Sequence, residues 1–150
     1  MFTGKDLNTP NSFVEIDNQA ELDLTNETFN TILQIVVSEE NLSTRSFLSL
    51  RLSNDGQIKK LNARYRGKDE LTDVLSFKAE IPGVPFLGDI IIDTNVAAEQ
   101  KENRSLMEEL SVLFLHGLLH LLDYDHLSAE QQIIMKNKEI KYINLLKEKI

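Results

Sequence analysis

Residues 110–126 read LSVLFLHGLLHLLDYDH and contain all three histidines of the chain, His116, His120 and His126. Between residues 110 and 122, the only other positions that are not apolar are Ser111 and Gly117. Apolar residues on every face are typical of a helix that is buried all round. Imidazole rings inside such a helix need partners, because burying a polar group without one is costly. The stretch therefore predicts a buried central helix whose histidines bind a partner group.

The spacing of the histidines predicts a metal site. His116 and His120 stand four residues apart, so on a helix they project from one face with Cβ atoms about 5–6 Å apart. His126 follows an expected helix end at residues 123–125 and could return as a third ligand. Three histidines that leave one position open are typical of catalytic zinc, whereas a structural site takes a fourth protein ligand. The competing interpretation is a set of core histidines satisfied by hydrogen bonds.

Composition favours one domain spanning residues 1–150. The chain is 41% hydrophobic, which suits a single core at this length. It has no cysteine, consistent with a reducing compartment and excluding thiolate metal ligands. Residues 1–12 are polar, and no stretch reaches the roughly 18 uninterrupted apolar residues of a membrane span. We expect a cytoplasmic protein without membrane contact. Its net charge of −8 argues against a surface coated with nucleic acid.

The apolar pattern predicts an α/β (α+β-like) fold with about four strands and about five helices. We expect the strands to form one mixed sheet, and the buried metal-binding helix to lie at the centre of the domain. Strands are expected at 13–16, 47–52, 72–77 and 86–93, the last of them central. Helices are expected at 24–40, 56–64 and 94–103, from 105 through the histidines, and from 128 onward. The last helix should have one apolar side, formed by Ile133, Ile134, Ile140, Ile143 and Leu146.

The histidine spacing also invites comparison with zinc peptidases. His-x3-His-x5-His matches the ligand spacing of the metzincins. Those enzymes need a glutamate directly after the first histidine, as the general base that acts on water. Here that position is Gly117. Proteolysis therefore ranks below other kinds of hydrolysis.

Three stretches resemble one known family, the YbeY-type endoribonucleases, which are bacterial rRNA maturation factors. The family pattern around the metal is close to His-Gly-x-Leu-His-Leu-x-Gly-Tyr-Asp-His, and residues 116–126 reproduce it except that Asp123 replaces a glycine. Residues 61–77, which include Tyr65-Arg66-Gly67-Lys68-Asp69, and residues 87–90, Leu-Gly-Asp-Ile, are similar as well. A glycine before the third ligand suits a left-handed turn, and aspartate is among the less penalised substitutes there.

This resemblance implies a zinc-dependent, single-strand-specific endoribonuclease with one zinc ion per chain. It implies a role in ribosomal RNA maturation, including small-subunit rRNA processing, and in ribosome quality control. Ribosomal RNA and the ribosome or its proteins would then be the partners. It also implies an arginine that faces the metal, which maps onto Arg66 as a catalytic residue. A guanidinium can hold a phosphate bidentately and stabilise developing charge. The alternative for Arg66 is a surface ion pair with Asp69 or Glu70.

The basic residues gather in one segment, where Lys59, Lys60, Arg64, Arg66 and Lys68 lie within ten positions. We expect Lys60, Arg64 and Lys68 to contact RNA phosphates. The alternative is an ordinary solvated helix face, which is the better interpretation for Lys59.

Asp89, in the central strand, is a candidate carboxylate that hydrogen-bonds behind a ligand histidine and orients it. It could equally cap the end of the strand. Two rival functions stay open at this point: a non-catalytic ribosome-assembly or RNA-binding module with structural zinc, and another metal-dependent hydrolase.

Overall fold

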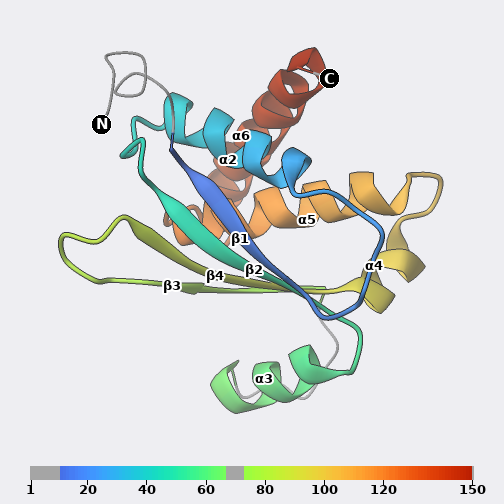
Figure 1. Cartoon of the computed structure of the whole chain (residues 1–150). Coiled ribbons are helices and arrows are strands. Elements are labelled where there is room, and N and C mark those ends of the chain that lie inside the picture. Colours follow the sequence, from blue (N-terminus) through green and yellow to red (C-terminus); the bar gives the residue numbers. More distant parts are fainter. Residues whose placement is uncertain (1–10, 67–72, 150) are drawn as a thin grey trace, which may run out of the picture.

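The computed structural model describes residues 11–66 and 73–149, and a four-stranded mixed sheet runs through it (Figure 1). The strands are β1 (Phe13–Asn18), β2 (Phe47–Ser53), β3 (Val74–Lys78) and β4 (Phe86–Asp93). They lie in the order β1-β2-β4-β3; β1, β2 and β4 are parallel, and β3 runs antiparallel to β4. The predicted mixed sheet is confirmed, and β4 lies inside it as its apolar run indicated.

The described ranges contain five helices: α2 (Glu27–Glu39), α3 (Gln57–Arg66), α4 (Thr94–Gln100), α5 (Leu106–Leu121) and α6 (Ala129–Lys149). Helices α2, α5 and α6 cover one face of the sheet, and α3 lies against the other (Figure 1). The larger hydrophobic core fills the space between the first group and the sheet. None of the helices in the described ranges has the length and apolar character needed to cross a membrane. The expected α/β class, with strands and helices in these numbers, is confirmed.

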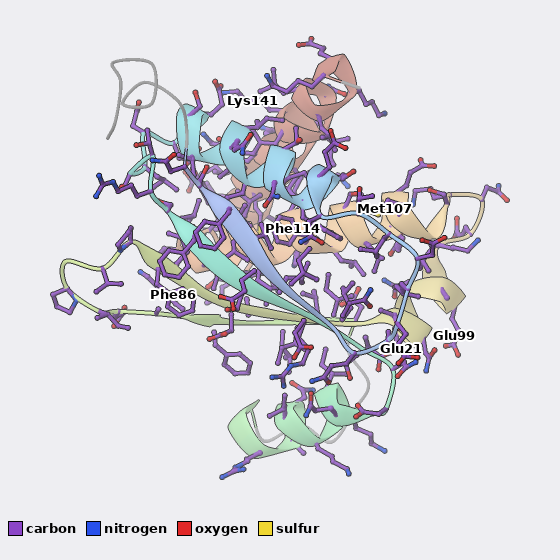
Figure 2. All side chains as sticks on the ribbon, viewed as in Figure 1. Glu21, Phe86, Glu99, Met107, Phe114 and Lys141 are labelled. Atoms are coloured by element: carbon purple, nitrogen blue, oxygen red, sulfur yellow. The ribbon has the colours of Figure 1, made fainter. Side chains whose placement is uncertain are left out.

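Helix α5 occupies the middle of the main core. Phe114 is fully buried, and its ring meets that of Phe29 on α2 edge-on, with 5.2 Å between the ring centroids (Figure 2). The predicted capping box is present: the Ser105 side chain accepts from the Glu108 amide, and the Glu108 carboxylate accepts from the Ser105 amide. The prediction of a central buried helix is therefore confirmed.

The outer sheet face carries a second, smaller core. Ile58 of α3 packs with Leu75 of β3 and Ile91 of β4. The preceding residue of β4, Ile90, belongs to the main core, because successive side chains of a strand point to opposite faces. Helices α3 and α5 therefore lie on opposite sides of β4.

The expectation for α6 was wrong in part. Ile133, Ile134 and Ile140 are 62%, 45% and 51% exposed. The buried positions are Met135, Tyr142 and Leu146, seven and then four residues apart, which places them on one face of the helix. Apolar residues lie on several faces of α6. Composition alone therefore did not identify the face of this helix that packs against the rest of the protein. Helix α4 also ends at Gln100, earlier than expected.

Candidate metal centre

Two ligand candidates lie on consecutive turns of α5. The Nε2 atoms of His116 and His120 are 3.2 Å apart, and the ring centroids are 4.7 Å apart. Two nitrogens bound at about 2.05 Å to one tetrahedral zinc ion would lie about 3.3 Å apart. The four-residue spacing on one helix therefore brings these two rings to a separation that fits a shared ion.

A left-handed turn brings the third histidine back. Asp123 has φ of +72°, the conformation for which glycine is favoured. The Tyr124 amide donates to the Leu119 carbonyl (3.0 Å) and the Asp123 amide to the His120 carbonyl (3.0 Å), which is the hydrogen-bond pattern of a Schellman motif. The Asp123 carboxylate also pairs with Lys78 Nζ of β3 at 2.6 Å. Asp123 thus adopts the left-handed conformation at the position where the family pattern has glycine.

The turn closes a three-histidine cluster. One ring nitrogen from each of His116, His120 and His126 lies within 4.8 Å of the other two. The His126 side chain is 57% exposed, so the cluster opens to solvent on that side. In the part of the chain that the structure describes, no carboxylate joins this group as a fourth ligand. The donors are all imidazole nitrogens, a set that suits zinc, and the arrangement leaves room for a substrate or water.

A carboxylate from α6 completes the site, and the sequence analysis missed it. Glu139 Oε1 lies 2.8 Å from His116 Nδ1. An acceptor at this position requires Nδ1 to carry the proton, which leaves the Nε2 lone pair facing His120 and the proposed ion. Glu139 follows His116 by 23 residues on another helix. No spacing rule joins the two, so only the packing of α6 on α5 could identify the pair.

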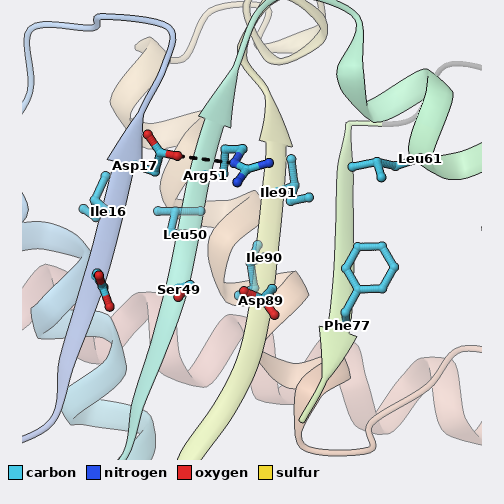
Figure 3. A pocket seen from close by; sticks show the side chains of 11 residues that line it. Ile16, Asp17, Ser49, Leu50, Arg51, Leu61, Phe77, Asp89, Ile90 and Ile91 are labelled. Atoms are coloured by element: carbon cyan, nitrogen blue, oxygen red, sulfur yellow. Dashed lines mark ion pairs between the residues drawn. The ribbon is translucent and has the colours of Figure 1, made fainter.

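Asp89 does not take the role that the sequence suggested for it. It lines a hollow on the outer sheet face, together with Asp17, Arg51 and Phe77 (Figure 3). Its neighbour Ile90 is the residue that faces α5, and alternation along the strand turns Asp89 away from the histidines. Burial raises the pKa of the Asp89 carboxyl, and nearby Arg51 lowers it in part. The carboxylate that does contact a histidine of the cluster is that of Glu139.

The basic cluster is likewise separated from the histidines. Lys60 and Arg64 are exposed on α3, which packs on the sheet face opposite α5. The sheet therefore stands between these two side chains and the metal helix. The side chain of Arg66 and the whole of Lys68 lie outside the described residues.

Gly117 has a structural reason to be glycine. A Cβ at this position would lie 3.1 Å from Ile90 Cγ2 and 3.3 Å from Val74 Cγ2. The helix therefore packs closely on the sheet, and the position points into that contact. A glutamate there would be forced into the core and could not serve as a general base beside the metal.

Comparison with known proteins identifies the family of the chain. The family model described as "Endoribonuclease YbeY" matches residues 12–147. An endoribonuclease YbeY of Bacillus licheniformis is 38% identical, over 82% of this chain and 92% of the relative. That of Nautilia profundicola is 40% identical, over 88% and 92%. The solution structure of TM1509 from Thermotoga maritima superposes with a TM-score of 0.63 at 26% identity, covering 89% of each chain. The chain belongs to the Endoribonuclease YbeY family.

Proposed function

We propose that this protein is a zinc-dependent endoribonuclease that cleaves single-stranded RNA during ribosomal RNA maturation. The observation that carries the proposal is the cluster of three imidazoles, open on one side and oriented from behind by Glu139. Membership of the family supports RNA as the substrate class. We further propose small-subunit rRNA processing, ribosome quality control, contacts with the ribosome or its proteins, and a cytoplasmic location.

The histidines and Glu139 would have distinct roles in cleavage. His116, His120 and His126 would hold a zinc ion, which would supply Lewis acidity toward a phosphodiester oxygen or water. Glu139 keeps His116 in the tautomer whose Nε2 faces that ion. His126 is exposed to solvent, so a strand of RNA could reach the metal site from that side. The scissile phosphate would thus be oriented beside the three histidines, at the C-terminal end of α5.

Arg66 is proposed as the residue that holds the scissile phosphate. The resemblance of residues 61–77 to the family supports this role, and a guanidinium suits bidentate contact with a phosphate. Lys68 is proposed to contact the RNA backbone beside it. Lys60 and Arg64 are proposed to contact a more distant part of a long RNA, because the sheet separates them from the histidines.

Two rival functions are less well supported. A structural zinc site would be closed by a fourth ligand, whereas His126 is solvent-exposed and no fourth side chain from the described residues joins the cluster. A peptidase would need a base at residue 117, and that position packs against Ile90 and Val74. The first observation favours a catalytic over a structural site, and the second favours a substrate other than a peptide.

The test compares wild-type protein with His120→Ala and Arg66→Glu, all untagged and prepared identically. Zinc per chain is measured by mass spectrometry, and cleavage is followed on matched single-stranded and double-stranded RNA. We expect about one zinc per wild-type chain, almost none in His120→Ala, and cleavage lost in both variants. Arg66→Glu should retain its zinc, since it acts on phosphate rather than on the metal.

Arg45→Glu serves as the matched control, because it makes the same charge change at an exposed loop residue. It should cleave as the wild type does. Cleavage that survives both His120→Ala and Arg66→Glu would refute the proposal. Nuclease activity that separates from the protein peak during purification would favour the non-catalytic module.

A further inference from the structure

Glu40 stands at a position that its own helix does not favour. It is the C-cap of α2, where the helix dipole presents negative charge and disfavours a carboxylate. Its side chain is nevertheless only 14% exposed. Burial of a carboxylate in such a place is stable only with good partners. The reason for this residue must therefore lie in the contacts it makes with other parts of the chain.

Both carboxylate oxygens of Glu40 are used. The Tyr124 hydroxyl donates to Oε1 at 2.6 Å, Lys138 Nζ lies 2.9 Å from Oε2, and the Tyr142 hydroxyl also donates to Oε2. Burial raises the pKa of the Glu40 carboxyl, but the hydrogen bonds from Tyr124, Tyr142 and Lys138 outweigh it and hold the pKa below its ordinary value. These partners lie 84 to 102 residues further along the chain.

The three partners belong to two parts of the metal centre, the turn that precedes His126 and helix α6. Tyr124 sits in the turn between α5 and His126, directly after Asp123 with its positive φ. Lys138 is the neighbour of Glu139, whose carboxylate contacts His116 Nδ1. Tyr142 lies one turn beyond Glu139 on the same helix. One carboxylate on α2 thus fixes both the turn that returns the third histidine and the helix that orients the first.

We infer that Glu40 is a positioning residue of the metal centre, which acts through Tyr124 on His126 and through α6 on Glu139. The inference rests on the proposed zinc site and adds to it a contact outside the ligand set. Without Glu40, the turn would keep its backbone hydrogen bonds but lose its contact with the end of α2, and α6 would lose the ion pair of Lys138. We expect the geometry of three ligands to loosen, and zinc to bind more weakly.

Glu40→Gln is the decisive variant. It keeps the size of the side chain, but its amide NH2 would replace an oxygen that accepts from two donors. Groups behind metal ligands typically change metal affinity by about 10- to 100-fold, and we expect a loss in this range. Zinc affinity is measured by competition with a chromophoric chelator, on the full-length untagged protein. Melting of the metal-free protein is measured in parallel.

Glu39→Gln is the matched control. Glu39 is the adjacent carboxylate at the same helix end, and it pairs with Lys141 of the same partner helix at 3.0 Å. Within the described part of the chain, Glu39 makes no hydrogen bond or ion pair with the turn or with Glu139. We expect Glu39→Gln to bind zinc as the wild type does, even if the contact between α2 and α6 weakens.

Two tyrosine variants separate positioning from general stability. Tyr124→Phe and Tyr142→Phe each remove one hydroxyl that donates to Glu40, but only Tyr124 belongs to the metal turn. Tyr124→Phe should weaken zinc binding more, whereas Tyr142→Phe, which is more deeply buried, should lower the melting temperature of the metal-free protein more. The double variant Glu40→Gln/Tyr124→Phe should lose less than the sum of the two single losses.

The outcomes are distinct. Zinc affinity in Glu40→Gln equal to that in Glu39→Gln, with a zinc-binding wild type, overturns the inference and leaves the metal centre intact. A wild type that binds no zinc overturns the metal centre and the inference with it. If Glu40→Gln does not fold, Tyr124→Phe decides: unchanged zinc affinity in that variant also overturns the inference.

Discussion

Replacement of Glu139 should weaken metal binding in two graded steps. The carboxylate lies 2.8 Å from His116 Nδ1, with 25% of its side chain exposed. Glu139→Gln can still accept the Nδ1 proton through its amide oxygen, but it loses the charge. Hydrogen bonds to charged groups contribute about 1.5–3 kcal/mol and neutral ones about 0.5–1.5 kcal/mol. The difference of about 1 to 1.5 kcal/mol corresponds to about tenfold in zinc affinity.

Glu139→Ala removes the acceptor altogether and frees the ring to rotate. Its loss should approach the upper end of the range for groups behind a metal ligand, about 100-fold. The assay is chelator competition on untagged protein, with Glu148→Gln as the control near the far end of the same helix. Equal zinc affinity in the wild type, Glu139→Gln and Glu139→Ala would refute the orienting role. A glutamine variant weaker than the alanine variant would refute the hydrogen-bond argument behind the order.

Three further variants test the surroundings of the site. Asp123→Gly removes the backbone strain of an aspartate at φ +72°, worth about 1 kcal/mol, but it also removes the ion pair with Lys78. Because salt screens that ion pair, the variant should gain more unfolding free energy over the wild type at high salt than at low salt. A variant less stable than the wild type at high salt, measured by chemical denaturation, would contradict this. Gly117→Ala should lower the unfolding free energy by up to about 2 kcal/mol. Overpacking of the new methyl group against Ile90 costs about 1–3 kcal/mol, and the higher helix propensity of alanine offsets about 1 kcal/mol of that cost. An increase in unfolding free energy would show that the side chains of the sheet move aside easily. Asp89→Asn should stabilise the protein at pH 7 and leave zinc affinity unchanged. The pKa of Asp89 is raised in the folded state, so its charged form opposes folding above that pKa, and the advantage of asparagine should fade as the pH falls toward the ordinary value of 3.8; an advantage that persists at low pH would point to another cause.

The cluster of three histidines could be predicted from the sequence because its parts are local. His116 and His120 are fixed relative to each other by one turn of helix, whatever the rest of the chain does. His126 follows through a short turn, in which the backbone hydrogen bonds donated by Asp123 and Tyr124 close within residues 119–124. The capping box that starts α5 is equally local. The number of strands also followed, since apolar periodicity is set by which faces are buried.

The surroundings of the ligands depended on the tertiary structure. Asp89 and Ile90 are neighbours in sequence, yet the pleat of β4 sends them to opposite faces, and only the placement of α5 decides which one meets the metal helix. The same sheet separates Lys60 and Arg64 from the histidines.

The two carboxylates that support the site come from helices that meet only in the folded protein. Glu139 reaches His116 from α6, and Glu40 reaches Tyr124 from α2. The sequence by itself determined the cluster of three histidines, because their spacing is a property of one helix and the turn that ends it. The tertiary structure alone decided which carboxylates lie against that cluster and its turn, because contacts between elements distant in the chain depend on which faces the whole fold buries together.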